Sequence, residues 1–191
     1  VLVVCIGNCT KLCELLTAEY KEYVATIKLG KKTDTGDITG NVIEEKEYLV
    51  NEKQIVEVLN SFKGTSIQTV PIYSAVKVNG KKLYEYARSN KEVELPKREI
   101  NVSKIELIDF HDDEIVFKTI VSKGTYIRSL IEDICTKLNT VGTMSSLTRT
   151  KQGMFTLEDS YTLEEIINND YKITSKEVAL QDLEHIELTE S

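Results

Sequence analysis

The sequence predicts an α+β fold, and two kinds of periodicity carry this prediction. Apolar residues alternate with others from residue 115 to 121, which is typical of a strand with one face on a core. A second alternation starts at Tyr23 and continues to Leu29. Helical spacing follows the first strand almost at once, with apolar residues at Ile127, Leu130, Ile131, Ile134 and Leu138. The chain therefore combines half-buried strands with amphipathic helices.

The first forty residues are predicted to hold two further elements and a polar loop. Val1 to Ile6 is a continuous apolar run, which we interpret as a buried strand. Asn8 or Thr10 can then cap a helix that reaches about Leu16. Residues 33–40 are dense in carboxylates and hydroxyls, and they lack the spacing of a calcium-binding loop. Local turns stabilised by Asp side chains are the expected structure there.

The middle of the chain carries two local signals. Asn51 with Gln54 has the form of a capping box at the start of a helix. Its apolar face is expected to comprise Ile55, Val58, Leu59 and Phe62. Asn79-Gly80 is a strong signal for a type I′ hairpin turn, and a short helix can follow before Pro96.

The rest of the chain shows weaker patterns. We expect a strand from Ile100 to Leu107 and another that includes Gly153 to Phe155. Thr162 with Glu165 again has the form of a capping box at a helix start.

Length and composition indicate a cytoplasmic protein of one domain, or of one domain with a small appendage. A chain of 191 residues can bury a substantial core, and no run approaches the roughly 20 apolar residues that span a bilayer. Cys5, Cys9 and Cys13 are spaced by four and Cys135 is remote, which does not match the paired spacing of a structural zinc site. We therefore expect reduced thiols and no metal.

The charge is unevenly distributed. The chain has a net charge of −7, which by itself argues against nucleic acid as a partner. Residues 77–98 nevertheless hold seven basic and three acidic side chains, so this segment carries +4 and the remainder −11. The segment could meet phosphates, or it could be a solvated charged loop.

The turn from Ser122 to Arg128 holds the residues best suited to chemistry. Gly124 permits a sharp turn, which presents Tyr126 and Arg128 where the strand end and the helix start meet. A cation in the first helical turn is mildly unfavourable against the macrodipole. Taken alone, Arg128 is best explained by a pair with Glu132, and Tyr126 by a half-buried ring. The complete turn is harder to explain as packing.

Six stretches spread over nearly the whole chain form a more specific set. They are Lys21-Glu22-Tyr23, Leu29-Gly30 with Thr33-Asp34-Thr35-Gly36-Asp37, Tyr73-Ser74-Ala75-Val76-Lys77, Gly80 to Arg88, Ser122 to Arg128, and Leu147 to Thr150. In this order they resemble the TruB family of bacterial tRNA pseudouridine synthases.

The resemblance implies a fold and an activity. The fold would be a mixed, largely antiparallel sheet with flanking helices, and residues 71–98 would form an inserted RNA-binding thumb. Residues 1–191 would be part of the catalytic domain, with the family's C-terminal PUA-like domain absent. The activity would be isomerisation of uridine to pseudouridine at position 55 in the T loop of tRNA. The family's reaction uses no cofactor and needs no metal.

The resemblance also implies catalytic roles. Tyr23 would stack on the flipped base and assist removal of the C5 proton, and Tyr126 would pack against the nucleotide. Arg128 would pair with the family's nucleophilic Asp and keep it ionised. That Asp belongs to a G-x-L-D-P-x-A-T-G motif, which precedes the stretch resembling Val1 to Gly7. No Asp of this chain has such a context, so we expect the chain by itself to be inactive.

Substrate contacts follow in the same way. Asp37 would contact the region of the flipped base, and Lys81, Lys82 and Arg88 of the thumb would bind RNA. The expected partner of a monomeric protein is the T stem-loop of tRNA, with no membrane. The alternative is a non-catalytic RNA-binding module or tRNA-folding chaperone that kept the thumb.

Overall fold

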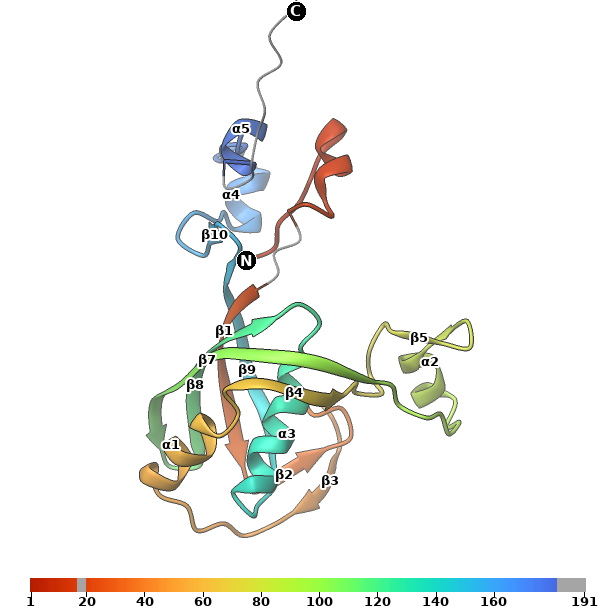
Figure 1. The fold of residues 1–191 in the computed structure, drawn as a ribbon, viewed down its shortest axis with the longest axis vertical. Helices are drawn as coiled ribbons and strands as arrows, with labels where there is room; N and C mark the ends of the chain where they lie inside the picture. The colour runs from red at the N-terminus through yellow and green to blue at the C-terminus, as the bar shows by residue number, and fades with distance from the viewer. Residues whose placement is uncertain (17–19, 182–191) are drawn as a thin grey trace, which may run out of the picture.

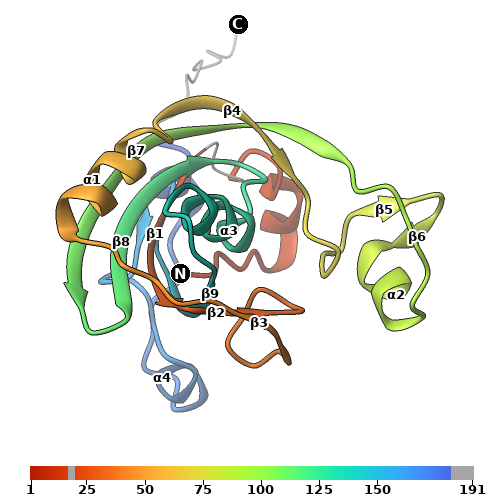
Figure 2. The ribbon, with the colours of Figure 1, turned by 90° about the horizontal axis from the view of Figure 1, so that it is seen from below.

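A computed structural model describes residues 1–16 and 20–181, and it shows a curved antiparallel sheet wrapped around a helix (Figures 1 and 2). The order of the six strands is β10-β9-β1-β8-β7-β4, and each neighbouring pair is antiparallel. Their bounds are β1 Tyr20–Leu29, β4 Gly64–Thr69, β7 Lys97–His111, β8 Glu114–Ser122, β9 Gly142–Gln152 and β10 Phe155–Thr156. The predicted α+β class with a largely antiparallel sheet is confirmed.

The core lies between the concave face of the sheet and helix α3 (Ile127–Lys137), which Figure 2 shows inside the curve of the strands. Every second residue of β8 is buried, as the alternation predicts. Thr119 is the polar member of this row, and its hydroxyl donates to the carbonyl of Lys104 at 2.9 Å. The apolar stripe of α3 is also confirmed, because Ile127, Leu130, Ile131 and Ile134 are all buried.

Helix α1 (Glu52–Asn60) forms as its sequence predicts. The Asn51 side chain accepts from the backbone of Gln54, and the Gln54 side chain accepts from the backbone of Asn51, so the capping box is complete. Ile55 and Leu59 are buried in the core, which fixes α1 beside α3 and β7.

Two small hairpins complete the body. One pairs β2 (Lys31–Thr33) with β3 (Val42–Glu45), and it was not predicted. The other pairs β5 (Lys77–Val78) with β6 (Lys81–Lys82) around Asn79 and Gly80, whose φ values are 50° and 80°. These positive values are those of a type I′ turn, as predicted. With α2 (Leu83–Arg88) this hairpin lies within residues 71–98, which stand to one side of the sheet (Figure 1) and which we call the thumb by position alone.

The prediction of a buried strand from Val1 to Ile6 is wrong. These residues form no strand, and the side chains of Leu2 and Val4 are 76% and 71% exposed. A 3₁₀ helix, Gly7–Leu12, replaces the expected helix to Leu16, and it begins after Ile6 without a side-chain cap. The physical reason is a lack of burial, because Leu2, Val4 and Ile6 are exposed and no described strand of the sheet pairs with this run.

Strand bounds also differ from the sequence patterns. Strand β1 begins three residues before Tyr23, and β7 extends well beyond Ile100–Leu107 at both ends. Gly153, with φ 58°, is in the turn between β9 and β10, so a strand through Gly153 and Met154 is wrong. The Thr162–Glu165 capping box is confirmed at α4 (Leu163–Ile167), and α5 (Lys176–Ala179) was not predicted.

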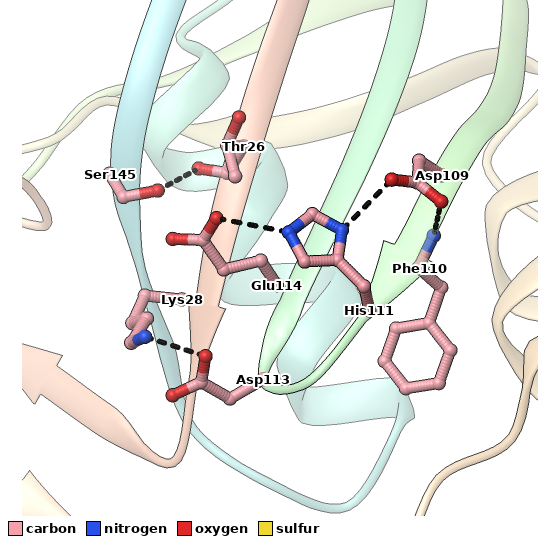
Figure 3. A network of polar contacts seen from close by, with 8 residues as sticks. All are labelled: Thr26, Lys28, Asp109, Phe110, His111, Asp113, Glu114 and Ser145. Carbon is pink, nitrogen blue, oxygen red and sulfur yellow. Dashed lines mark hydrogen bonds and ion pairs between the residues drawn. The ribbon is translucent and has the colours of Figure 1, made fainter.

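The turn between β7 and β8 is tied to its surroundings by polar contacts (Figure 3). Nδ1 of His111 lies 2.8 Å from a carboxylate oxygen of Asp109, and Nζ of Lys28 donates to Asp113 at 2.5 Å. The Lys28 ammonium lowers the pKa of Asp113. This network fixes the end of the sheet opposite the start of α3.

The described residues contain neither a membrane-spanning helix nor a cluster of metal-binding side chains. No helix there is long and apolar enough to cross a bilayer. Across residues 1–16 and 20–181, no three His, Cys, Asp or Glu side chains are arranged to hold a metal ion.

The four cysteines differ in burial, and this predicts their reactivity. Cys135 is buried against Gly142, and burial raises the pKa of its thiol to about 12, whereas Cys13 is exposed. Since the thiolate is the nucleophile, iodoacetamide in mildly alkaline buffer should alkylate Cys13 and leave Cys135 unmodified. Peptide mass spectrometry measures both sites, and the denatured chain is the control. Equal alkylation of the two cysteines in the native chain would contradict this packing.

Candidate functional site

The turn between β8 and α3 places Tyr126 and Arg128 at one end of the sheet. Gly124 has φ 87°, and the amide of Thr125 donates to the carbonyl of Ser122 to close the turn. The hydroxyl of Ser122 accepts from the amide of Asn101, which joins the turn to β7. Tyr126 follows as the residue before α3, and its own side chain makes no capping bond.

Gln68 holds the backbone of Tyr126 in place. Oε1 of Gln68 accepts from the Tyr126 amide at 2.8 Å, and its Nε2 donates to the Tyr126 carbonyl at 3.1 Å. The Gln68 residue is 1% exposed although the residues on both sides of it in β4 are exposed. The sequence analysis missed Gln68, because a glutamine in a strand is ordinarily a surface residue. No local pattern marks it as buried.

Arg128 is bound by backbone carbonyls instead of by a carboxylate. Its Nη1 donates to the carbonyl of Thr35 at 3.0 Å, and its Nη2 donates to that of Tyr73 at 2.8 Å. The expected pair with Glu132 is wrong, because Glu132 pairs with Lys32 at 2.5 Å. Among the described residues Arg128 forms no ion pair. Its position is therefore fixed while its charge is not neutralised.

Arg128 also lines a cavity of about 240 Å³. One wall comes from the loop at Thr33 to Gly36 and the other from Val70 to Tyr73. Asp133 of α3 borders the same space, and burial raises the pKa of its carboxyl. Neither Tyr23 nor Tyr126 is among the lining residues.

Asp37 organises the loop that Arg128 contacts. One oxygen of its carboxylate accepts from the amide of Thr39 at 3.0 Å and from the Thr39 hydroxyl at 2.7 Å. These two bonds lower the pKa of Asp37, and the Arg128 guanidinium lowers it further. The structure thus places Asp37 close enough to Arg128 to feel its charge, with its carboxylate engaged by Thr39.

Tyr23 lies on the concave face of the sheet, where it is partly buried and packs against the core. Its neighbours across the ladder are Thr119 of β8 and Arg149 of β9. Two residues earlier, Lys21 is paired with Val121, one residue before the turn at Ser122. Tyr23 is therefore near the end of the sheet at which α3 begins, on the face that α3 covers.

The three predicted thumb cations lie apart from these residues. Arg88 and Lys82 both face the ring of Tyr84, with charged groups 5.3 Å and 5.4 Å from its centre. Lys81 is exposed at the hairpin. An open groove of about 820 Å³ separates α2 from the chain at Tyr73, with Tyr86 and Leu95 in its walls.

The clamp on Tyr126 predicts a loss of stability when Gln68 is replaced. Gln68→Met keeps the shape but removes both hydrogen bonds and leaves a shielded amide without a partner. We expect the free energy of unfolding to fall by about 2 kcal/mol. Urea denaturation measures it, and Gln152→Met at the end of β9 is the control. Equal effects of the two substitutions would argue against the clamp.

The contacts of Asp37 predict an order of pKa changes. Thr39→Val should raise the pKa of Asp37 more than Arg128→Gln does, because the Thr39 hydroxyl contributes more to its lowering. The folded pKa lies below the unfolded one, so ionised Asp37 stabilises the loop at neutral pH and this stabilisation is lost on acidification. Carboxyl NMR titration measures each shift. The reverse order would contradict the loop geometry.

Two family models match successive parts of the chain. The TruB family pseudouridylate synthase (N terminal domain) matches residues 1–127. The tRNA pseudouridylate synthase B C-terminal domain matches residues 128–186. The boundary between the two falls after the first residue of α3, so it does not coincide with a gap in the fold.

Curated relatives are similar along most of the chain. The tRNA pseudouridine synthase B of Clostridium tetani is 44% identical over 193 residues, covering 100% of this chain and 67% of the relative. That of Staphylococcus aureus (strain MSSA476) is 48% identical over 174 residues, covering 87% of this chain and 57% of the relative. The corresponding protein of Limosilactobacillus reuteri is 45% identical, with 87% and 58% covered. The chain thus spans between about half and two thirds of these relatives.

Solved structures share the fold. A chain in the crystal structure of a Cbf5-Nop10-Gar1 complex superimposes with a TM-score of 0.63 at 29% identity, covering 85% of this chain and 40% of the other. A chain in the structure of an H/ACA RNP bound to a substrate RNA containing 2′-deoxyuridine gives 0.59 at 26% identity, covering 85% and 38%. Together with the match over residues 1–127, these likenesses show that the chain belongs to the TruB family of pseudouridylate synthases.

Proposed function

We propose that this protein contributes the greater part of the catalytic domain of an enzyme that isomerises uridine to pseudouridine at position 55 in the T loop of tRNA. The observation that carries the proposal is the state of Arg128, which two carbonyls hold without neutralising its charge. Family membership supplies the reaction. In this chain, Arg128 would orient the catalytic carboxylate, and Tyr23 and Tyr126 would hold the flipped base.

The chemistry explains why a fixed cation matters. The N-glycosidic bond of the uridine breaks and a bond from the sugar to C5 of the same base forms. The proton on C5 is lost and N1 gains a proton, so the composition of the nucleotide does not change. A carboxylate that attacks or stabilises the reacting sugar or base must be ionised. A guanidinium beside it lowers its pKa and fixes its direction.

The carboxylate in this proposal belongs to the Leu-Asp-Pro motif that the family places before the stretch resembling Val1 to Gly7. Arg149 donates from Nε to the carbonyl of Val1 at 2.6 Å, and Arg149 is the ladder neighbour of Tyr23. A segment joined to Val1 would therefore enter the molecule next to Tyr23. This placement supports Tyr23 as a residue beside the entering segment.

The aromatic residues have complementary roles. Tyr23 would stack on the flipped uracil and assist removal of the C5 proton, and Tyr126 would pack against the nucleotide. Gln68 would keep Tyr126 in place through the two backbone hydrogen bonds. Asp37 would border the flipped base by ordering the loop that ends at Thr39.

The thumb would grip the T stem-loop. Lys81, Lys82 and Arg88 carry charges that suit phosphates, and Tyr84 holds two of these cations on one surface. Recognition would depend on the shape and the backbone of the RNA more than on its sequence. We propose that the protein acts in the cytoplasm as a monomer.

Arg128→Ala tests the central role. The variant is made in the protein extended upstream by the Leu-Asp-Pro segment, with Lys53→Ala on α1 as the control. Conversion in a T stem-loop RNA should fall by about 100-fold or more, because the carboxylate loses its orienting cation, while RNA binding remains. Mass spectrometry of the digested RNA measures pseudouridine.

Three results would overturn parts of the proposal. If Arg128→Ala formed pseudouridine at the rate of the unsubstituted protein, Arg128 would not be the residue that orients the carboxylate. Pseudouridine made by the 191-residue chain alone would show that the nucleophile lies elsewhere. Tight binding without any conversion by the extended protein would favour a non-catalytic RNA-binding module.

A further inference from the structure

The turn Asn79-Gly80 joins β5 to β6 and takes no part in the proposed reaction. It is the one place in the sequence where an asparagine precedes a glycine. Both residues are exposed, and the hairpin stands away from the sheet with the rest of the thumb (Figure 1). In such a pair the backbone nitrogen of the second residue can attack the side-chain carbonyl carbon of the first, because glycine has no side chain to obstruct the approach.

The backbone nitrogen of Gly80 is free to react. Among the hydrogen bonds formed by the described residues, none uses the Gly80 amide as a donor. A Cβ built at Gly80 would meet no atom within 4 Å, so the space beside this residue is open. Lys77, Lys81 and Lys82 lie on the two sides of the turn, and their charges favour the deprotonated nitrogen that makes the attack.

The backbone at Asn79 can reach the reactive geometry by a local opening. The two strands of the hairpin are joined by two residue pairs only, and a hairpin of this length has little stability of its own. The hydroxyl of Tyr86 donates to the carbonyl of Val78 at 3.0 Å, which holds the strand before the turn but not the turn itself. Opening of such a segment costs much less free energy than global unfolding.

Asn90 provides a comparison within the same thumb. Like Asn79 it is exposed, and its φ is 48° against 50° for Asn79. The two sites differ in the residue that follows. Lys91 has a side chain that obstructs the attack, and its amide donates to the carbonyl of Tyr86 at 3.1 Å. A difference in reactivity between the two asparagines would therefore come from the following amide, since exposure and φ are alike.

We propose that Asn79 is a modification site, where the side-chain amide converts spontaneously to a carboxylate and thereby weakens the grip of the thumb on RNA. The nitrogen of Gly80 attacks Cγ of Asn79, the Cγ–Nδ2 bond breaks, and ammonia leaves with the proton of the Gly80 amide. Water then opens the cyclic imide at either of its carbonyls, which gives aspartate or isoaspartate. No group is oxidised or reduced.

The two products change the thumb in different ways. Aspartate adds a negative charge beside Lys81, which opposes phosphate binding, but it tolerates the positive φ of position 79, so the turn survives. Isoaspartate routes the backbone through the former side chain, and the extra carbon disturbs the match between the turn and the twist of its strands. The effect on RNA rests on the proposed function, whereas the chemical step does not.

The first experiment measures the modification in the 191-residue chain. The chain is aged in mildly alkaline buffer made with ¹⁸O-labelled water, and peptide mass spectrometry follows Asn79 and Asn90. Labelling by an isoaspartyl methyltransferase separates isoaspartate from aspartate. Lys91→Gly is the matched control, because it makes a second asparagine–glycine pair whose backbone nitrogen still donates to Tyr86.

Asn79 should be modified in the native chain while Asn90 stays intact. In Lys91→Gly, Asn90 should react about tenfold more slowly than Asn79, because a hydrogen bond must first be broken. The two sites of this variant should react at similar rates once urea has unfolded it. Equal native rates in Lys91→Gly would overturn the argument from the free amide, and an unmodified Asn79 would overturn the proposal.

The second experiment measures binding of a fluorescent RNA hairpin with a T-type loop, by anisotropy over a series of salt concentrations. Asn79→Asp and Asn90→Asp add the same charge at two places in the thumb. Asn79→Asp should reduce the salt slope by about 0.9 units, which corresponds to one lost phosphate contact, and Asn90→Asp should change it less. The aged chain should bind more weakly than Asn79→Asp, because isoaspartate also disturbs the hairpin.

The outcomes separate this inference from the proposed function. Equal RNA binding by Asn79→Asp and Asn90→Asp would overturn the effect of the modification on the thumb and leave the proposed function standing. A fresh chain that binds no RNA would contradict the proposed function and the effect on RNA together. The reaction at Asn79 is measured without RNA, so neither result bears on the chemical step.

Discussion

The structure of the site depends on one interaction, the fork of Arg128 donating to the carbonyls of Thr35 and Tyr73. These acceptors belong to segments that are remote in sequence, the loop after β2 and the chain that enters the thumb. Hydrogen bonds from a charged donor are stronger than neutral ones. A single side chain therefore fixes α3 relative to the loop at Thr35 and to the base of the thumb at Tyr73. Because both acceptors are neutral, the positive charge remains available. The same residue thus joins three segments of the fold and leaves a positive charge in the candidate site.

Support for this interaction comes from both sides. Asp37 closes its loop through Thr39, so that Thr35 presents its carbonyl to the guanidinium. Gln68 secures Tyr126 at the start of α3, where a Ser, Thr, Asp or Asn cap would be usual. Gln68 bonds both the amide and the carbonyl of Tyr126, and the side chain of Tyr126 makes no capping bond. The helix start is therefore stabilised from β4, at the edge of the sheet.

What the sequence predicts well is local, and what it misses depends on distant segments. The alternation in β8, the stripe of α3 and the Asn79-Gly80 turn follow from side chains within a few residues of one another. The partner of Arg128 could not be found in this way, because backbone carbonyls have no sequence signature. The prediction for Val1 to Ile6 was wrong for a related reason, since an apolar run forms a strand only where tertiary packing buries it, and Leu2, Val4 and Ile6 are exposed. The family motifs pointed to Tyr23, Tyr126 and Arg128 as candidates, but they did not predict the contacts that hold these residues in place.

The Tyr73 carbonyl has a mechanical consequence. Tyr73 lies between β4 and β5, at the base of the thumb, so the backbone there supplies an acceptor of Arg128. The direction of the Arg128 guanidinium and the backbone position at the base of the thumb are therefore coupled through one hydrogen bond. A change of backbone conformation at Tyr73 would alter the environment of a cation 55 residues further along the chain.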